Sequence, residues 1–500
     1  MKTIAHIVPH SLKGIVLLFL MFGTSEFVTI AAQTDEERRQ WEQYKAKAQE
    51  EYDAYSEKEK EEYAAFRKKA NEEYALFLKT EWKSVAVASS IMPPKMPKPP
   101  APIQSPREKA PSRRHIAVGG IDKIVLEPSL VPIPPVSCPR RVKKSMVVSY
   151  YGTPVIVHGD SLLRFHLTSI DGESLSLVWK QLSSNMYEDL LYDCLEVKRT
   201  RQFGDWAYVE FCGQVSQTLL GRECDEAVVL QTWLLTQSGY AVRISKIENQ
   251  LVIMVPFREL IFGYGFIDRN GTRYYALTKK DYGERTKCTF CDIPFPREHV
   301  ASIGMINPPI LCVEQTQRKS LLKDVEVFTN ENLIDFYSNY PLSNEWGLYA
   351  RVSFSHELKK VLYPQLQEIL KNVGEKEKVR ILLDWVQHVF RYKTDQEQFG
   401  YEKPMFADES FYYPFNDCED RSIVFASLVR DLVGLDVTLI EYSKHMATAV
   451  AFPTETDGDY IEVDGRKYVV CDPTYIGADI GESMPDLKNE NVNVVLINKY

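Results

Sequence analysis

An eleven-residue repeat near the N-terminus constrains this chain more than any other feature. Residues 34–84 contain no Gly or Pro, and pairs of aromatic residues recur there at a fixed interval: Trp41 and Tyr44, Tyr52 and Tyr55, Tyr63 and Phe66, and Tyr74 and Phe77. Eleven residues over three turns give about 3.67 residues per turn, which keeps the aromatic side chains on a nearly straight stripe of one helix. One isolated helix cannot bury that stripe. Two interpretations stay open: self-association, as a right-handed coil, or packing of the helix on the chain's own globular part.

A proline-rich segment follows this predicted helix. Prolines crowd residues 93–139, beginning with Pro93-Pro-Lys-Met-Pro-Lys-Pro-Pro100, and basic residues outnumber acidic ones in the same stretch. Proline cannot continue a helix and favours extended conformations, so we expect a solvated linker. Contact with an anionic glycan or lipid surface is the alternative interpretation.

The first residues read as a targeting segment. Lys2 and Lys13 precede the apolar run 14–23, and the small residues of 29–32 follow it. This order is typical of a secretory signal peptide, here cleaved near residue 32. We therefore expect an exported protein, periplasmic or extracellular, with no transmembrane span once the signal is removed. An uncleaved anchor is the alternative, although Glu26 interrupts the apolar run.

Length and composition bound the classes that remain. A chain of 500 residues with 44% hydrophobic and 12% aromatic residues should form more than one folded unit. A net charge of −9 argues against a dedicated nucleic-acid binder. Nine cysteines in an exported chain would be prone to pair, and the odd number leaves one over. Cys288 and Cys291, with His299 and Cys312 downstream, allow a zinc site, but a local disulfide or two ordinary thiols is the favoured interpretation.

The segment with most chemistry lies near the C-terminus. Asn416-Asp-Cys418-Glu-Asp420 opens an apolar helical pattern that Gly434 ends. Asp417 suits the N-cap, and Asp420 three residues later completes a capping-box arrangement. Cys418 then lies in the first turn, where the helix dipole favours thiolate over thiol. A nucleophilic cysteine benefits from this position.

Two predicted hairpins follow this helix. Residues 436–442 and 445–452 alternate as paired strands, and Asp464-Gly465 marks a second tight turn between 460–463 and 466–472. His445 begins one strand and Asp472 ends another. In an antiparallel sheet packed on the Cys418 helix, both side chains could lie beside the thiol. Taken singly, each residue is more often structural, and only their combination indicates a site.

These blocks resemble the transglutaminase-like superfamily, a branch of the papain-like fold. The resemblance rests on Asp417-Cys418-Glu419-Asp420, on His445 before a strand, and on Asp464-Gly465 followed by Cys471-Asp472-Pro473-Thr474, in that order. It covers roughly residues 375–480. It implies Cys418 as nucleophile, His445 as general base and acid, and Asp472 as the residue that orients His445, with no metal or cofactor. Cys471 could pair with another cysteine and distort the site.

Two further questions concern the same site. The Cys418 backbone N–H and one donor from the preceding segment could stabilise an oxyanion, and the candidates for that donor are Tyr412, Tyr413 and Asn416. His388 is a rival base, on a predicted helix over 379–391. Its surface context there fits solvent or core better than catalysis.

A weaker copy of the pattern lies 194 residues upstream. Glu223-Cys224-Asp-Glu226 aligns with Asp417-Cys418-Glu-Asp420, but His445 aligns with Leu251 and Asp472 with Thr278. We therefore expect residues 145–285 to form a degenerate transglutaminase-like domain with no triad. The competing explanation is chance agreement between two helix–hairpin patterns.

The sequence thus predicts an α+β protein with a papain-like or transglutaminase-like helix packed on antiparallel sheet, in two copies. The expected parts are a signal peptide (1–32), a repeat helix that can form a coiled coil (33–90), a basic linker (91–144), the degenerate domain (145–285), a connecting region (286–374) and a catalytic domain (375–500). The predicted function is an exported cysteine protease or amidase that cleaves an amide or isopeptide bond of a peptide or protein substrate. The alternative is a noncatalytic peptide- or glycan-binding assembly protein, a homo-oligomer through residues 34–84.

Overall fold

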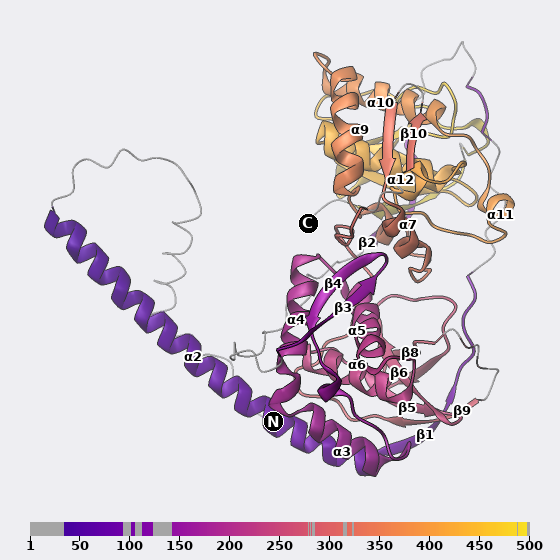
Figure 1. Ribbon diagram of the computed structural model, residues 1–500. Helices are drawn as coiled ribbons and strands as arrows, with labels where there is room; N and C mark the ends of the chain where they lie inside the picture. The colour runs from indigo at the N-terminus through magenta and orange to yellow at the C-terminus, as the bar shows by residue number, and fades with distance from the viewer. Residues whose placement is uncertain are drawn as a thin grey trace. The chain divides into compact units, whose positions relative to one another are not determined.

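The computed structural model describes residues 35–93, 102–105, 113–123, 143–278, 280, 282, 286–313, 318–322, 325–487 and 489–497 (Figure 1). The predicted signal peptide lies outside these residues, as does much of the proline-rich linker. The chain divides into two compact units, Met1–Ala65 and Phe66–Tyr500. Among the described helices, none is long and apolar enough to cross a bilayer.

A single helix, α2 (Asp35–Thr80), covers the repeat. In the first unit it exposes the tyrosines of the stripe, including Tyr44, Tyr52 and Tyr55. In the second unit the stripe is partly buried, because Tyr74 packs against Trp179 and other aromatic side chains. The helix ends at Thr80, and the next residues form a strand, β1 (Trp82–Val87), although the sequence predicted helix as far as residue 90.

Helices and antiparallel sheets together make up the second unit, which confirms the predicted α+β class. Its first half contains a hairpin, four helices and a sheet in the strand order β1-β9-β5-β6-β8-β7, with every pair antiparallel. The bounds are β3 (Ser145–Tyr150), β4 (Thr153–His158), α3 (Gly172–Leu182), α4 (Glu188–Thr200), α5 (Asp205–Leu220), α6 (Asp225–Gln237), β5 (Arg243–Ile247), β6 (Gln250–Pro256), β7 (Phe266–Arg269), β8 (Thr272–Ala276) and β9 (Thr286–Cys291).

The second half again contains a hairpin, then helices, then a sheet, but its helices differ from those of the first half in number and length. Its sheet has the order β14-β15-β13-β12-β16-β2. The bounds are β2 (Val118–Lys123), β10 (Arg318–Leu322), β11 (Val325–Thr329), α7 (Glu331–Ser338), α8 (Trp346–Ala350), α9 (His356–Ile369), α10 (Glu375–Val389), α11 (Asp395–Gln398), α12 (Cys418–Leu428), the π-helix η4 (Val429–Val433), β12 (Val437–Glu441), β13 (Met446–Val450), β14 (Tyr460–Val463), β15 (Arg466–Cys471) and β16 (Val492–Leu496).

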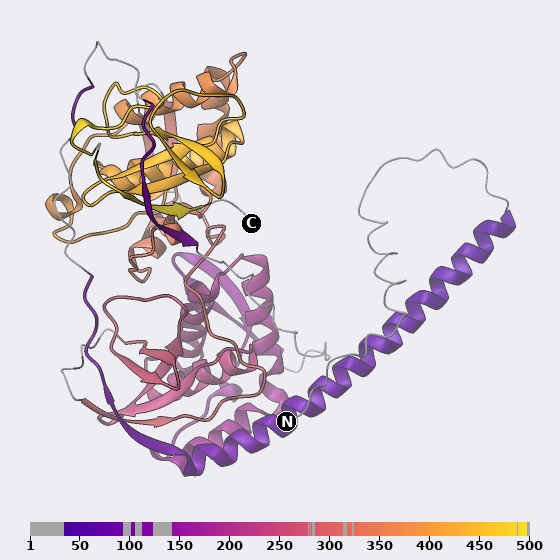
Figure 2. The ribbon, with the colours of Figure 1, turned by 180° about the vertical axis from the view of Figure 1, so that it is seen from behind.

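The two sheets share one topology. From the strand that comes earliest in the chain, the orders are β1-β9-β5-β6-β8-β7 and β2-β16-β12-β13-β15-β14, so each strand of one sheet has a counterpart at the same place in the other. In each, a helix (α6 or α12) precedes the central hairpin and packs on it. One difference is at the edge: β1 runs antiparallel to β9, whereas β2 runs parallel to β16. Figure 2 shows β2, in purple, beside the yellow strands of the C-terminal sheet.

These pairings assign several segments differently from the predicted domain map. Strand β2 lies within the predicted linker, and β9 lies within the predicted connecting region, yet each is a full member of a sheet. Hydrophobic side chains on the helix-facing surfaces of both sheets belong to one continuous core. That core fixes the helices against the sheets and therefore fixes the first turns of α6 and α12.

Candidate active site

Cys418 is the first residue of α12, as the sequence predicted. Asp417 is the N-cap, and its backbone N–H donates to Asp420 Oδ2 at 3.1 Å, which forms one arm of a capping box. The Ser422 hydroxyl donates to the Met446 carbonyl at 3.1 Å and links the helix to β13. These two hydrogen bonds fix the start of α12, and they hold the Cys418 thiol at the positive end of the helix dipole.

Strand register brings His445 and Asp472 together. His445 directly precedes β13, and Asp472 directly follows β15, whose residue Cys471 pairs with Thr448 of β13. His445 Nε2 lies 2.8 Å from Asp472 Oδ2. The other carboxylate oxygen of Asp472 accepts from the backbone N–H groups of Thr474 at 2.9 Å and Tyr475 at 3.2 Å, so the carboxylate cannot turn away.

The imidazole is strongly basic for a buried group. Burial favours its neutral form, but the charge and hydrogen bond of Asp472, followed by the Cys418 thiol, raise the pKa of His445 to about 10. The sulfur is therefore within interaction range of the ring. In this conformation the thiol donates to Glu419 Oε2 at 3.0 Å, and His445 Nδ1 makes no hydrogen bond to any described residue.

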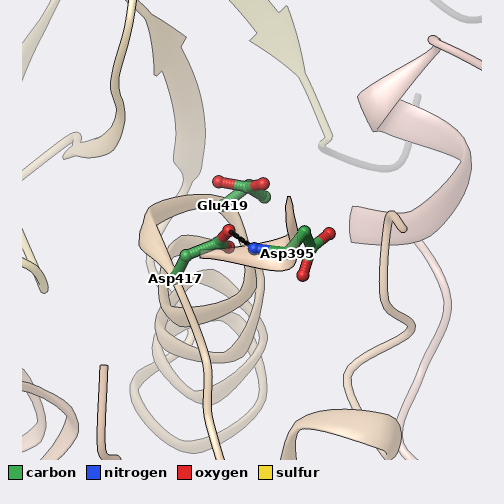
Figure 3. A group of neighbouring side chains, drawn as sticks. All are labelled: Asp395, Asp417 and Glu419. Carbon is green, nitrogen blue, oxygen red and sulfur yellow. Dashed lines mark hydrogen bonds between the residues drawn. The ribbon is translucent and has the colours of Figure 1, made fainter. Parts of the chain in front are cut away.

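Buried carboxylates surround the start of the helix (Figure 3). Oxygen atoms of Asp395, Asp417 and Glu419 lie within 4.8 Å of one another, and the Asp395 N–H donates to Asp417 Oδ2 at 3.2 Å. Burial, reinforced by the negative charge of Asp417, raises the pKa of Asp395 to about 9. Burial likewise raises the pKa of Asp417 to about 6 and holds the pKa of Glu419 well above its usual value. A pKa of about 9 means that Asp395 is protonated at neutral pH, and burial shifts the pKa of Glu419 in the same direction.

The same carboxylates are the residues that could hold a metal. Their oxygen atoms suit a hard divalent cation. The predicted alternative of a zinc site at Cys288, Cys291, His299 and Cys312 finds no support in the described residues, because their ligand atoms do not form a common group. Both thiols of that pair are free and buried on β9.

Sequence reasoning missed Gln387, which supports the site from α10. Its amide donates to the carbonyls of Asp472 and Ala478, both at 3.1 Å, and its carbonyl accepts from the Gly477 N–H at 2.9 Å. The neighbouring His388, the rival base, lies on the exposed face of the helix, where Nδ1 is 2.8 Å from the Asp384 carbonyl. The sequence signal that could have found Gln387 is the helical periodicity of residues 379–391, which places residue 387 on the buried face of the helix.

The three candidate oxyanion donors differ in position. Asn416 is buried, and its Nδ2 donates to the Ser410 carbonyl at 3.1 Å. The Tyr413 hydroxyl lies 3.3 Å from Ser338 Oγ, and Tyr412 stacks edge-on against Tyr413, so neither ring is shown beside the thiol. Tyr392, which the sequence analysis did not consider, is close enough to Cys418 that the thiol adds to the effect of burial in raising its pKa.

The site is enclosed. Cys418 and His445 are each 3% exposed and Asp472 is 1% exposed. Cys471 is also buried, and its thiol is free, so it does not form the disulfide that would have distorted Asp472.

The counterpart positions in the first sheet carry no histidine base. Cys224 is the N-cap of α6 and is half-buried. Leu251 lies on β6, where its N–H donates to Asp225 Oδ1 at 2.7 Å, and Thr278 follows β8. The arrangement of helix and strands matches that around Cys418, but an aliphatic side chain stands where His445 stands in the second sheet.

Comparison with protein-family models, with curated proteins and with solved structures found no match. The chemistry of the site is therefore inferred from its own side chains.

Proposed function

We propose that this protein is a transglutaminase-like cysteine hydrolase that cleaves an amide or isopeptide bond through Cys418, His445 and Asp472. The observation that carries this proposal is the 2.8 Å contact between His445 Nε2 and Asp472 Oδ2 beside a cysteine at a helix N-terminus. A thiol, an imidazole and a carboxylate in this order are the parts of an activated cysteine nucleophile. Water is the acceptor in the simplest form of the reaction.

The raised pKa of His445 supports a thiolate–imidazolium pair as the resting state. The Cys418 thiol proton passes to His445 Nδ1, and the thiolate sulfur forms a bond to the substrate carbonyl carbon. His445 then returns the proton to the leaving amine as the C–N bond breaks. A water molecule, deprotonated by the same nitrogen, attacks the thioester, releases the acid and restores the thiol. Asp472 keeps the ring oriented throughout and neutralises the imidazolium.

The transglutaminase-like fold and its duplication belong to the same proposal. The shared strand order of the two sheets supports it, because the same order of six strands occurs in both, and a chance match of local hairpins does not account for that. On this interpretation the first copy retains the helix and the sheet but no longer has the histidine that would act as the base. We also propose export of the protein, on the sequence of residues 1–32 alone.

The test is the pH dependence of Cys418 alkylation by iodoacetamide, followed at that residue by peptide mass spectrometry because other thiols are present. Alkylation that persists well below the ordinary thiol pKa of about 8.5 is expected in the wild type. It should be lost in His445→Ala and shifted to higher pH in Asp472→Asn. Alkylation that rises only near the ordinary value, and is indifferent to His445, would remove the catalytic proposal.

A second candidate function is noncatalytic binding and assembly. Enclosure of the triad favours it, as does the contact of the thiol with Glu419 instead of His445. In that case the helix–sheet units hold a peptide or glycan, and the alkylation experiment shows an ordinary cysteine.

A further inference from the structure

Two buried thiols lie on neighbouring helices in the first half of the second unit. Cys194 lies on α4 and Cys212 on α5, and both residues are 0% exposed. Both thiols are free in the structure, and the candidate active site uses neither of them. In an exported chain, two cysteines that meet in the core are candidates for a covalent bond.

Helices α4 and α5 form a helical hairpin, because only residues 201–204 connect them. A connection this short makes the two helices antiparallel neighbours. Near the connection, Lys198 of α4 reaches α5, where its Nζ lies 3.3 Å from Asp205 Oδ1 and 5.6 Å from the centre of the Tyr208 ring. The faces of the two helices that carry Lys198 and Tyr208 are therefore turned toward each other.

The two cysteines lie one turn farther from the connection on these same faces. Cys194 precedes Lys198 by four residues, and Cys212 follows Tyr208 by four residues. Residues four apart lie one above the other on the same face of an α-helix. The register of the hairpin thus places Cys194 opposite Cys212.

The thiol groups also interact directly. A hydrogen bond with the Cys212 thiol, followed by burial, holds the pKa of Cys194 well above its usual value. Burial, followed by the thiols of Cys212 and Cys194, holds the pKa of Tyr208 well above its usual value. The contact between the side chains and the register of the helices therefore identify the same pair.

The other closely spaced pair, Cys288 and Cys291, lacks this arrangement. The two residues are three apart on β9, and residues an odd number apart on a strand face opposite sides of the sheet. Cys288 belongs to a separate small core cluster, whereas Cys291 belongs to the main core. Their thiols point to opposite sides, so the structure favours two ordinary thiols over the local disulfide that the spacing also allowed.

We propose that Cys194 and Cys212 form an intramolecular disulfide bond, made while the chain folds in an oxidising compartment. The thiolate of one cysteine attacks the disulfide of the oxidant, which is a protein or glutathione disulfide, and releases one oxidant thiol. The thiolate of the second cysteine attacks the mixed disulfide and releases the other oxidant thiol. The chain loses two electrons and two protons, and the oxidant disulfide becomes two thiols.

Burial sets the time at which this bond can form. In the folded unit neither side chain is accessible to an oxidant, and the raised pKa of Cys194 leaves little thiolate. In the unfolded chain both thiols are exposed and titrate near the ordinary value of about 8.5. Exchange therefore precedes packing, and the same burial then protects the finished bond from reductants.

Peptide mass spectrometry of the full chain tests this proposal. The chain is made by cell-free synthesis, in one reaction with oxidised glutathione and in another with reduced glutathione alone, and the soluble product is collected. N-ethylmaleimide, added together with urea, blocks every remaining thiol before digestion. A cross-linked peptide that joins Cys194 to Cys212 should be present in most chains from the first reaction. Both residues should be alkylated in chains from the second.

Substitutions assign the cross-linked peptide. Cys194→Ala and Cys212→Ala should each abolish it and leave the remaining cysteine of the pair alkylated. Cys312→Ala is the matched control, because Cys312 is free and half-buried, and it should leave the peptide unchanged. Circular dichroism checks that each variant is folded. Dithiothreitol should break the bond about tenfold more slowly in native buffer than in urea, because the folded core shields it.

The proposal is overturned if both cysteines are alkylated in chains made with oxidised glutathione. It is also overturned if either of them is joined to a different cysteine, or if dithiothreitol breaks the bond equally fast in native buffer and in urea. The oxidant is supplied in the reaction, so none of these results depends on export. None depends on the proposed hydrolase function either, because alkylation of Cys418 is a separate measurement.

Discussion

His445 Nε2 lies 2.8 Å from Asp472 Oδ2, and both side chains are almost fully removed from solvent. A buried charged pair is held by mutual attraction, and the loss of one member leaves the other without a partner. The pair therefore matters to stability as well as to chemistry.

Removal of the carboxylate should lower the pKa of His445 and destabilise the fold. For Asp472→Ala we expect a loss of about 3 kcal/mol in the free energy of unfolding at pH 6, because breaking a buried pair strands one polar group. The effect should shrink at higher pH. The pKa of His445 is raised by folding, so its stabilising contribution is complete below the unfolded value of about 6.5 and disappears as the pH rises through about 10. Urea unfolding measures the loss in the free energy of unfolding at pH 6 and at pH 9.5. An equal loss at the two pH values would contradict the prediction.

The buried carboxylates at the start of α12 should make the stability of the fold depend on pH in the direction opposite to that of an ion-paired carboxylate. Folding raises the pKa of Asp395 to about 9, so the folded state prefers the protonated form. Stability from this group is present below the unfolded pKa of about 3.9 and is lost as the pH rises toward 9.

Asp395→Asn should therefore stabilise the protein at pH 8.5 relative to the wild type and have little effect near pH 4.5. Calorimetric melting temperatures, taken in EDTA so that no divalent cation intervenes, measure this difference. The exposed Asp384→Asn is the control. A melting temperature for Asp395→Asn below that of the wild type at pH 8.5 would refute the assignment.

Gln387 should act as a positioning residue. Its three hydrogen bonds hold the turn that contains Asp472, so Gln387→Leu should cost about 2–3 kcal/mol in the free energy of unfolding and shift Cys418 alkylation to higher pH. Gln387→Glu keeps one acceptor and should retain more of the low-pH alkylation than Leu does. His388→Gln changes the adjacent exposed residue and should alter neither quantity.

The exposed part of the aromatic stripe predicts self-association. Tyr44, Tyr52 and Tyr55 are each more than two-fifths exposed on α2. Removal of residues 33–65 should lower the mass measured by light scattering to that of a monomer, whereas Lys47→Gln should not. The deletion must stop at Ala65, because Tyr74 lies in the core and β1 is a strand of the first sheet. A full-length chain that is already a monomer would favour packing of the stripe on the chain itself.

Local patterns predicted much of the candidate site. The capping pattern of Asp417 and Asp420 places Cys418 in the first turn of a helix, and the structure has it there. Asp464-Gly465 predicts a tight turn, and both residues adopt positive φ, of 49° and 76°. Such features depend on residues within a few positions of one another, so the sequence contains nearly all the information that decides them.

The sequence by itself determined the helix of the repeat, the position of Cys418 and the strands next to His445 and Asp472, although His445 precedes β13 and Asp472 follows β15 instead of lying within them. Only the tertiary structure decided that β1, β2 and β9 belong to the sheets, because an edge strand is selected by pairing with residues distant in the chain. The same is true of Asp395 and Gln387. Burial and neighbouring charges give these residues their properties, and both depend on which distant segments the packed core brings together.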